Sequence, residues 1–152
     1  MVYCKDDNRR GDHPERKFDF LGYTFRPQTS KSRQGRYFVN FSPSISKRAA
    51  KSIRETMRQW RIHRQSDKSL DELARISNPV IRGWINYYGC FYKSALYPIL
   101  QTLNNILARR ASRKYKRLRG RKRGAHLWLQ GIARRQPCLF AHWQLSQFKA
   151  GQ

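Results

Sequence analysis

Two adjacent acidic residues near the start of the chain have the chemistry to bind metal ions. Asp6 and Asp7 follow Tyr3 in the stretch VYCKDDNRR. Nucleic-acid polymerases hold two metal ions about 4 Å apart with carboxylates from separate segments of the chain, and one such segment has the form Tyr-x-Asp-Asp. The spacing here is Tyr-x-x-Asp-Asp, which is one residue longer. The sequence therefore raises the question of whether this pair belongs to a polymerase site.

The remaining acidic residues narrow the places where such a site could lie. All nine Asp and Glu lie at or before Glu72, and the 80 residues from Leu73 onward contain none. A metal site or an acid/base pair built from carboxylates therefore cannot form within the second half of the chain. Any catalytic site would have to use the first half.

Positive charge is the strongest signal in the composition. The chain of 152 residues has 33 Lys and Arg against 9 Asp and Glu, which gives a formal net charge of +24. Such a chain repels itself unless a polyanion neutralises it, and nucleic acid is the first candidate because Lys and Arg release counterions from phosphates. An anionic membrane is the second candidate. We expect no membrane partner, because the sequence has neither an apolar run long enough to span a bilayer nor a secretory signal behind Met1.

The cysteines favour a reducing compartment and no metal site. Cys4, Cys90 and Cys138 are an odd and scattered set, which is a poor disulfide framework. Cys138 and His142 have a separation found in zinc fingers, but no second pair of ligands accompanies them. We therefore expect no zinc, and we expect Cys138 to be a buried, small apolar residue.

The front of the chain predicts a β-hairpin over residues 18–41. FDFLGYTFR and RYFVNF are aromatic and alternating, which is typical of strands, and the polar stretch PQTSKSRQG between them predicts a long loop. Pro27 and Gly35 are the strand-breaking residues within that loop. Gly22 within the first strand predicts a bulge or a close approach by another backbone, with an ordinary core strand as the alternative.

The period of the apolar residues then changes to that of a helix. Ser44 or Ser46 can cap it, and Ala50, Ile53 and Met57 fall on one face. A second, basic stripe is offset by about 100° from the apolar one. A solvated face is the ordinary interpretation of one such stripe, and a nucleic-acid surface is the alternative.

Three further helical segments follow. The first begins near Ser69 with acidic residues in its first turn, and Pro79 is expected to divide it into two helices. A long amphipathic helix begins near Leu96 and is expected to end as a basic protrusion or loop near Gly120. One more short helix is expected over residues 126–132. The closing LFAHWQL predicts a strand or a packed tail. The fold class is thus α+β and mostly α, with an N-terminal β-hairpin followed by a helical bundle.

Three motifs in this order, FDFLGYTF, NPVIRGWINYYG and PCLFAHWQL, resemble the C-terminal part of group II intron reverse transcriptases, which are also called maturases. The matching portion is the end of the polymerase palm and the maturase-specific region, or X domain, which forms the thumb. The resemblance implies residual palm strands over residues 1–43 and a helical thumb-like bundle over residues 44–152. It also implies a place in the cytoplasm of a bacterium, with an organelle as the alternative.

The resemblance implies a primer-grip-like turn and two nucleic-acid partners. Phe20, Leu21, Gly22 and Tyr23 are similar to the hairpin at which the family brings its backbone close to the primer end. The thumb of the family clamps the template-primer duplex and contacts folded intron RNA, so group II intron RNA is the expected partner in splicing. The missing palm and fingers, or a second copy of the chain, are further expected partners.

The resemblance also answers the question raised by Asp6 and Asp7. It places VYCKDDNRR in a strand that leads to the primer-grip-like hairpin, downstream of the catalytic aspartates of the family. The Tyr-x-Asp-Asp motif, the other palm carboxylate and the fingers are missing, so we expect Asp6 and Asp7 on a surface turn near Arg9 and Arg10. We expect no catalytic residue, no metal and no cofactor in this chain, since Mg²⁺ would come only with the absent palm. The abrupt start also fits a truncated or split gene, or an excised fragment.

The expected RNA contacts are basic residues of the predicted helices and of the run from Arg109 to Arg123. They are Lys47, Lys51, Arg54, Arg58, Arg75, Arg82, Arg109, Arg110, Arg113, Lys114, Lys116, Arg117, Arg119, Arg121, Lys122 and Arg123. Two alternatives to an RNA-binding domain stay open. One is a subunit or fragment of an active RNA-directed DNA polymerase that needs a separate palm and fingers. The other is a nonspecific binder of polyanions, which excess charge alone would produce.

Overall fold

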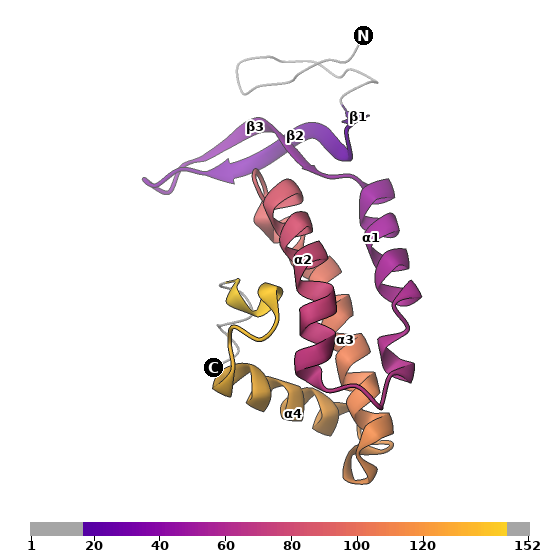
Figure 1. Ribbon diagram of the computed structural model, residues 1–152. Coiled ribbons are helices and arrows are strands. Elements are labelled where there is room, and N and C mark those ends of the chain that lie inside the picture. The colour runs from indigo at the N-terminus through magenta and orange to yellow at the C-terminus, as the bar shows by residue number, and fades with distance from the viewer. Residues whose placement is uncertain (1–16, 146–152) are drawn as a thin grey trace.

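The computed structural model describes residues 17–145, and it has a three-stranded antiparallel sheet followed by a bundle of helices (Figure 1). The predicted class, α+β and mostly α, is confirmed. The strands are β1 (Phe18–Phe20), β2 (Tyr23–Lys31) and β3 (Tyr37–Ile45). The α-helices are α1 (Lys47–Gln59), α2 (Leu70–Tyr88), α3 (Tyr97–Lys114) and α4 (Lys122–Arg135). The short 3₁₀ helices are η1 (Ile62–Arg64), η2 (Lys93–Ala95), η3 (Lys116–Leu118) and η4 (Ala141–Gln144). The strand and the surface turn predicted around Asp6 and Asp7 lie outside the described residues.

A tight turn divides the first predicted strand in two. Leu21 and Gly22 connect β1 to β2, and both have positive φ angles, 49° and 82°. Two such residues in succession give a two-residue hairpin whose twist matches that of the strands. The predicted bulge at Gly22 was therefore wrong, because Gly22 is the second residue of a turn. Leu21 is the strained residue of the pair, because a side chain is disfavoured in this conformation.

Strand β2 continues through Pro27, where the sequence predicted a loop. Ser46 donates its backbone N–H to the oxygen of Gly22 (2.8 Å), and hydrogen-bonded pairs recur at every second residue along an antiparallel ladder. Pro27 lies an odd number of residues from Gly22, so it faces Phe41 in a non-hydrogen-bonded pair. Its missing N–H points away from β3 and costs no ladder bond. The true loop is only the segment between Lys31 and Tyr37.

Helix α1 forms as its pattern predicted. Ser46 is the N-cap, and its hydroxyl accepts a hydrogen bond from the N–H of Ala49 (3.1 Å). Ile53 and Met57 are buried, so the predicted apolar face is the face that meets the core. The cap and the apolar face together fix the direction in which the basic stripe of α1 points.

Helix α2 is one continuous helix, and the predicted break at Pro79 was wrong. The helix begins at a capping box, in which Ser69 accepts from the N–H of Glu72 and the Glu72 carboxylate accepts from the N–H of Ser69. Proline inside a helix costs about 3 kcal/mol. Leu73 and Ile81 lie on either side of it and are both buried in the same core. Burial of such side chains contributes about 1.5–3 kcal/mol each, so packing of both halves outweighs the local penalty.

The sheet and α4 lie at opposite ends of the bundle formed by α1, α2 and α3 (Figure 1). Helix α3 supplies the central row of the core, where Leu100, Leu103 and Leu107 are fully buried. The tail predicted as a strand or a packed segment is packed, and it forms η4 against α2. Cys138 just before it is exposed, which contradicts its predicted burial. None of the helices within residues 17–145 has the length and apolar character needed to cross a membrane.

Two buried asparagines hold the C-terminal segment in place. Asn78 of α2 donates to the oxygen of Leu139 (2.8 Å) and accepts from the N–H of Ala141 (2.9 Å). The side-chain oxygen of Asn104, on α3, accepts from the indole N–H of Trp143 (2.9 Å) and lies 2.7 Å from Nε2 of His142. Asn78 therefore satisfies two backbone groups of the tail, and Asn104 satisfies two of its buried side chains.

Candidate nucleic-acid interface

The basic stripe of α1 lies on the outside of the bundle. Lys47, Lys51 and Arg58 are exposed and Arg54 is half-buried, on a face about 100° around the helix from Ile53 and Met57. Lys51 lies 3.9 Å from Glu55, one turn along the same surface. An exposed pair of this kind stabilises the helix by well under 1 kcal/mol, so it does not prevent Lys51 from meeting a phosphate.

Helix α2 carries its two predicted contacts on a second exposed face. Arg75 and Arg82 are exposed, and they are close in sequence to Ile76 and Val80, which are also exposed. Arg75 and Arg82 are seven residues apart and therefore share one face of the helix, where both can meet phosphates.

The run from Arg109 to Arg123 folds back on itself. Helix α3 ends at Lys114, η3 follows, Gly120 has a positive φ of 74°, and α4 begins at Lys122. The helix thus ends earlier than expected, because Leu118 of η3 is buried and the ring of Tyr115 lies 5.1 Å from that of Trp128 on α4. The exposed basic residues of the run are Arg109, Arg113, Lys114, Lys116, Arg117, Arg119, Arg121, Lys122 and Arg123. The backbone of this turn is therefore anchored to the bundle, and its exposed basic side chains extend from a fixed support.

Arg110 is the exception among the predicted contacts. Its side chain is only 1% exposed. It donates from Nε to the oxygen of Gln65 (3.0 Å) and from Nη2 to the oxygen of Lys68. These two carbonyls belong to the connection between α1 and α2, so Arg110 holds that connection against α3. Its prediction as an RNA contact was wrong, because a guanidinium engaged inside the fold cannot reach a phosphate.

The α1–α2 connection brings further basic residues to α3, and the sequence prediction missed them. Arg61, His63 and Arg64 come from η1 and the residue before it, and Arg113 of α3 donates to the oxygen of His63 (3.5 Å). Arg109 is the fifth member of this set, which we name the distal basic cluster. Burial first, and then the charges of Arg113, Arg64, Arg109 and Arg61, lower the pKa of His63. The cluster lies at the end of the bundle away from the sheet (Figure 1).

Three acidic residues, Asp67, Asp71 and Glu72, lie in or next to the start of α2. The Glu72 carboxylate accepts from the backbone N–H of Ser69 (2.6 Å), and hydrogen bonds from Ser69 lower the pKa of this carboxyl. Asp67 lies near enough to Arg110 for its charge to raise the pKa of that buried guanidinium, against the lowering by burial. Within residues 17–145, no ion pair joins a carboxylate to the distal basic cluster. The cluster therefore keeps its positive charge.

The turn predicted to be primer-grip-like is pinned to the end of α2. The Tyr23 hydroxyl donates to the oxygen of Tyr87, and the Tyr87 hydroxyl donates to the oxygen of Leu21 (2.9 Å). A Cβ added at Gly22 would lie 3.1 Å from the ring of Tyr88, so the close approach that needs glycine is to this ring. Phe20 and Leu21 are the exposed members of the four, and Tyr23 is buried.

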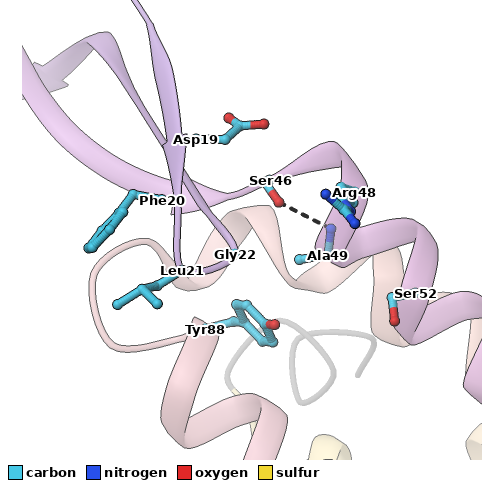
Figure 2. Close-up of a pocket in the computed structure, with 9 residues that line it drawn as sticks. All are labelled: Asp19, Phe20, Leu21, Gly22, Ser46, Arg48, Ala49, Ser52 and Tyr88. Carbon is cyan, nitrogen blue, oxygen red and sulfur yellow. Dashed lines mark hydrogen bonds between the residues drawn. The ribbon is translucent and has the colours of Figure 1, made fainter.

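A pocket of about 420 Å³ opens beside this turn (Figure 2). Its polar wall includes Arg48 and Ser52 of α1, with Asp19 of β1 across from them and Tyr88 below the turn. Among residues 17–145, no three His, Cys, Asp or Glu side chains lie close enough together to hold a metal ion. The pocket offers one cation, one carboxylate and hydroxyl groups, a set suited to binding and not to two-metal catalysis.

A comparison of the sequence with models of protein families gives a match. Residues 50–128, just over half of the 152 residues, match the family described as group II intron, maturase-specific domain, so the chain belongs to that family. The resemblance deduced from the three motifs is thereby confirmed. The comparisons with curated proteins and with solved structures found no match.

The matched segment runs from α1 into α4. It contains the distal basic cluster, η3 and all the predicted contacts except Lys47. The sheet and η4 lie outside it, although η4 contributes Phe140 and Trp143 to the same core. The basic surface and the family match thus coincide on one part of the chain.

Proposed function

We propose that this chain is the RNA-binding domain of a group II intron maturase and that it holds folded intron RNA during splicing. The observation that carries this proposal is the coincidence just described: the family match covers the segment that displays the basic surface. Fifteen of the sixteen predicted contacts have side chains that reach the surface, with Arg110 as the exception. Folded RNA is bound largely through its phosphates and 2′-hydroxyl groups, which suits a surface of spaced Lys and Arg.

The chain acts in this proposal as a binder and not as a catalyst. The matched family is a maturase domain, and the chain has no Asp or Glu beyond Glu72. The intron RNA supplies the transesterification chemistry. The protein lowers the free energy of the folded RNA by neutralising phosphates that would otherwise repel one another.

A second candidate function is the clamping of a template-primer duplex together with a separate palm and fingers. The pocket beside Gly22 favours it, because Arg48 and the hydroxyl groups of Ser52 and Tyr88 line a space next to the primer-grip-like turn. An Arg48→Gln substitution would weaken binding to a duplex with a recessed 3′ end. It would leave binding to folded intron RNA unchanged. If Arg48→Gln weakened binding to both ligands equally, the pocket would have no specific role in holding the duplex.

The first function is tested by removing charge from the anchored turn. Replacing Lys116, Arg117 and Arg119 with Gln removes three positive charges from an exposed part of the matched segment. We expect weaker binding to folded group II intron RNA and a log–log salt dependence that becomes shallower by about 2–3.

The matched control removes the same charge elsewhere. The control variant replaces the exposed Lys31, Arg33 and Arg36 around the end of the β2–β3 hairpin with Gln. We expect a much smaller loss of binding, because these residues lie outside the matched segment. Equal losses in the two variants would show that only net charge matters. The chain would then be a nonspecific binder of polyanions.

A further inference from the structure

The distal basic cluster is built around a buried anchor and a strained residue. Ile62 is buried, Arg61 before it is exposed and His63 after it is half-buried. Arg61 has a left-handed backbone (φ 48°, ψ 34°), which disfavours any residue with a side chain. Glycine would adopt this conformation at lower cost. Arg61 directly follows Trp60, the C-cap of α1, where a left-handed residue commonly ends a helix, and this turn sets the direction of its exposed side chain.

Helix α3 fixes the cluster from the other side. Arg110 holds the oxygens of Gln65 and Lys68, and Arg113 holds the oxygen of His63. The connection that carries the cluster is therefore attached to the core of the bundle through three carbonyls. Side chains on such a support lose less freedom when a ligand binds, which favours affinity.

Four arginines and one imidazole thus share a small surface. Arg61 and Arg64 flank His63 on its own segment, and Arg109 and Arg113 face it from α3. Their charges and burial lower the pKa of His63, which keeps this imidazole neutral at neutral pH in the free protein. Phosphates bound among these side chains would offset the positive charge and favour the protonated imidazole.

We propose that the distal basic cluster binds phosphates that face one another across the narrow major groove of an A-form RNA helix, and that His63 takes up a proton from solvent as they bind. This inference rests on the proposed function and names the RNA feature that the site receives. One arginine can donate two parallel hydrogen bonds to the oxygens of a phosphate. In the cluster, the arginines come from two elements, the segment around η1 and helix α3, and surround His63. A deep, narrow major groove brings the phosphates of two strands near each other, whereas a single extended strand does not.

The test compares one RNA hairpin with a single strand of the same length at pH 6.0 and 8.0. The wild-type chain should bind the hairpin more tightly than the single strand. Its affinity for the hairpin should rise several-fold at the lower pH if binding raises the pKa of His63 by one unit, because the full factor of ten is reached only well below the pKa of the free imidazole. The single strand should show a smaller effect of pH.

Three variants distinguish the contribution of His63 to the pH dependence from the contribution of the arginines to the affinity. His63→Gln should bind the hairpin at pH 8.0 within about twofold of wild type and should lose the gain at pH 6.0. His126→Gln is the matched control, because this half-buried histidine lies on α4, outside the cluster, and should keep the gain. Arg64→Gln should lower affinity roughly tenfold at both pH values, as expected for the loss of one charged hydrogen-bond donor.

Two results would overturn the inference. One is a gain at pH 6.0 that His63→Gln retains, and the other is equal binding of hairpin and single strand. If the wild-type chain prefers intron RNA over transfer RNA while Arg64→Gln binds like wild type, this site is wrong and the proposed function stands. If the wild-type chain shows no preference for intron RNA, the proposed function itself fails.

Discussion

The buried histidine of the C-terminal segment should make the fold sensitive to acid. His142 is fully buried, and burial lowers its pKa from 6.5 to about 3. The indole N–H of Trp143 can only donate, so the Asn104 atom that it meets is the acceptor oxygen. Nε2 of His142 lies 2.7 Å from the same oxygen and must therefore donate a proton to it. The neutral imidazole makes this bond inside the core.

The sign and size of the effect follow from this difference in pKa. Between pH 6.5 and pH 3 the unfolded chain binds a proton at His142 and the folded chain does not, so the free energy of unfolding falls as the pH falls. Each pH unit in this window costs about 1.4 kcal/mol. Lowering the pH from 7 to 5 should therefore remove about 2 kcal/mol of stability, and the whole window about 5 kcal/mol.

The assay is urea denaturation at pH 7 and pH 5 for the wild-type chain and for His142→Gln. The substitution removes the titrating group, so the wild-type chain should lose about 2 kcal/mol more than the variant between the two pH values. Taking the difference between the two proteins cancels the contributions of the carboxylates that they share. Equal losses would refute the assignment of His142 as a neutral, buried donor to Asn104.

Three further substitutions test local features of the fold by the same denaturation assay. Ser69→Ala removes one side of the capping box at the start of α2 and should lower the free energy of unfolding by about 1 kcal/mol, and no change would mean that the cap is dispensable. Leu21→Gly should raise it by roughly 0.5 kcal/mol, because Leu21 is exposed and strained, and a loss would show that its side chain packs. Arg110→Met keeps an apolar stem, leaves the oxygen of Gln65 without its donor and leaves the oxygen of Lys68 with only the long contact from Lys114 (3.4 Å). This substitution should lower the free energy of unfolding by roughly 2 kcal/mol. No change would mean that the guanidinium of Arg110 is not held inside the fold and could still contact RNA.

Elements with local signals were predictable from the sequence. Ser46 and Ser69 were recognised as starts of helices because a capping hydroxyl and the residues it serves are neighbours in the chain. The core faces of α1 and α3 followed from apolar spacing alone. The family was recognisable because three motifs occur in the right order.

Elements that depend on distant contacts were not predictable. Pro79 lies inside α2 because both halves of that helix pack on one core, and no local rule shows this. Arg110 looks like its basic neighbours in the sequence, yet the fold brings the α1–α2 connection over it. The distal basic cluster joins Arg61 and Arg64 to Arg109 and Arg113, which lie more than 40 residues further along the chain. The stretch RIHR was the available signal, but only the fold shows what it faces.

The central claim is that this domain recognises folded group II intron RNA by itself. The most direct test measures binding of the 152-residue chain to such an RNA between 50 and 200 mM salt, with excess transfer RNA as competitor. If 6–10 phosphates are neutralised, affinity should fall about 10³–10⁵-fold over this range. We predict that the preference for intron RNA survives the competitor throughout. Complete displacement by transfer RNA would contradict the claim, because it would show that the basic surface responds to charge alone.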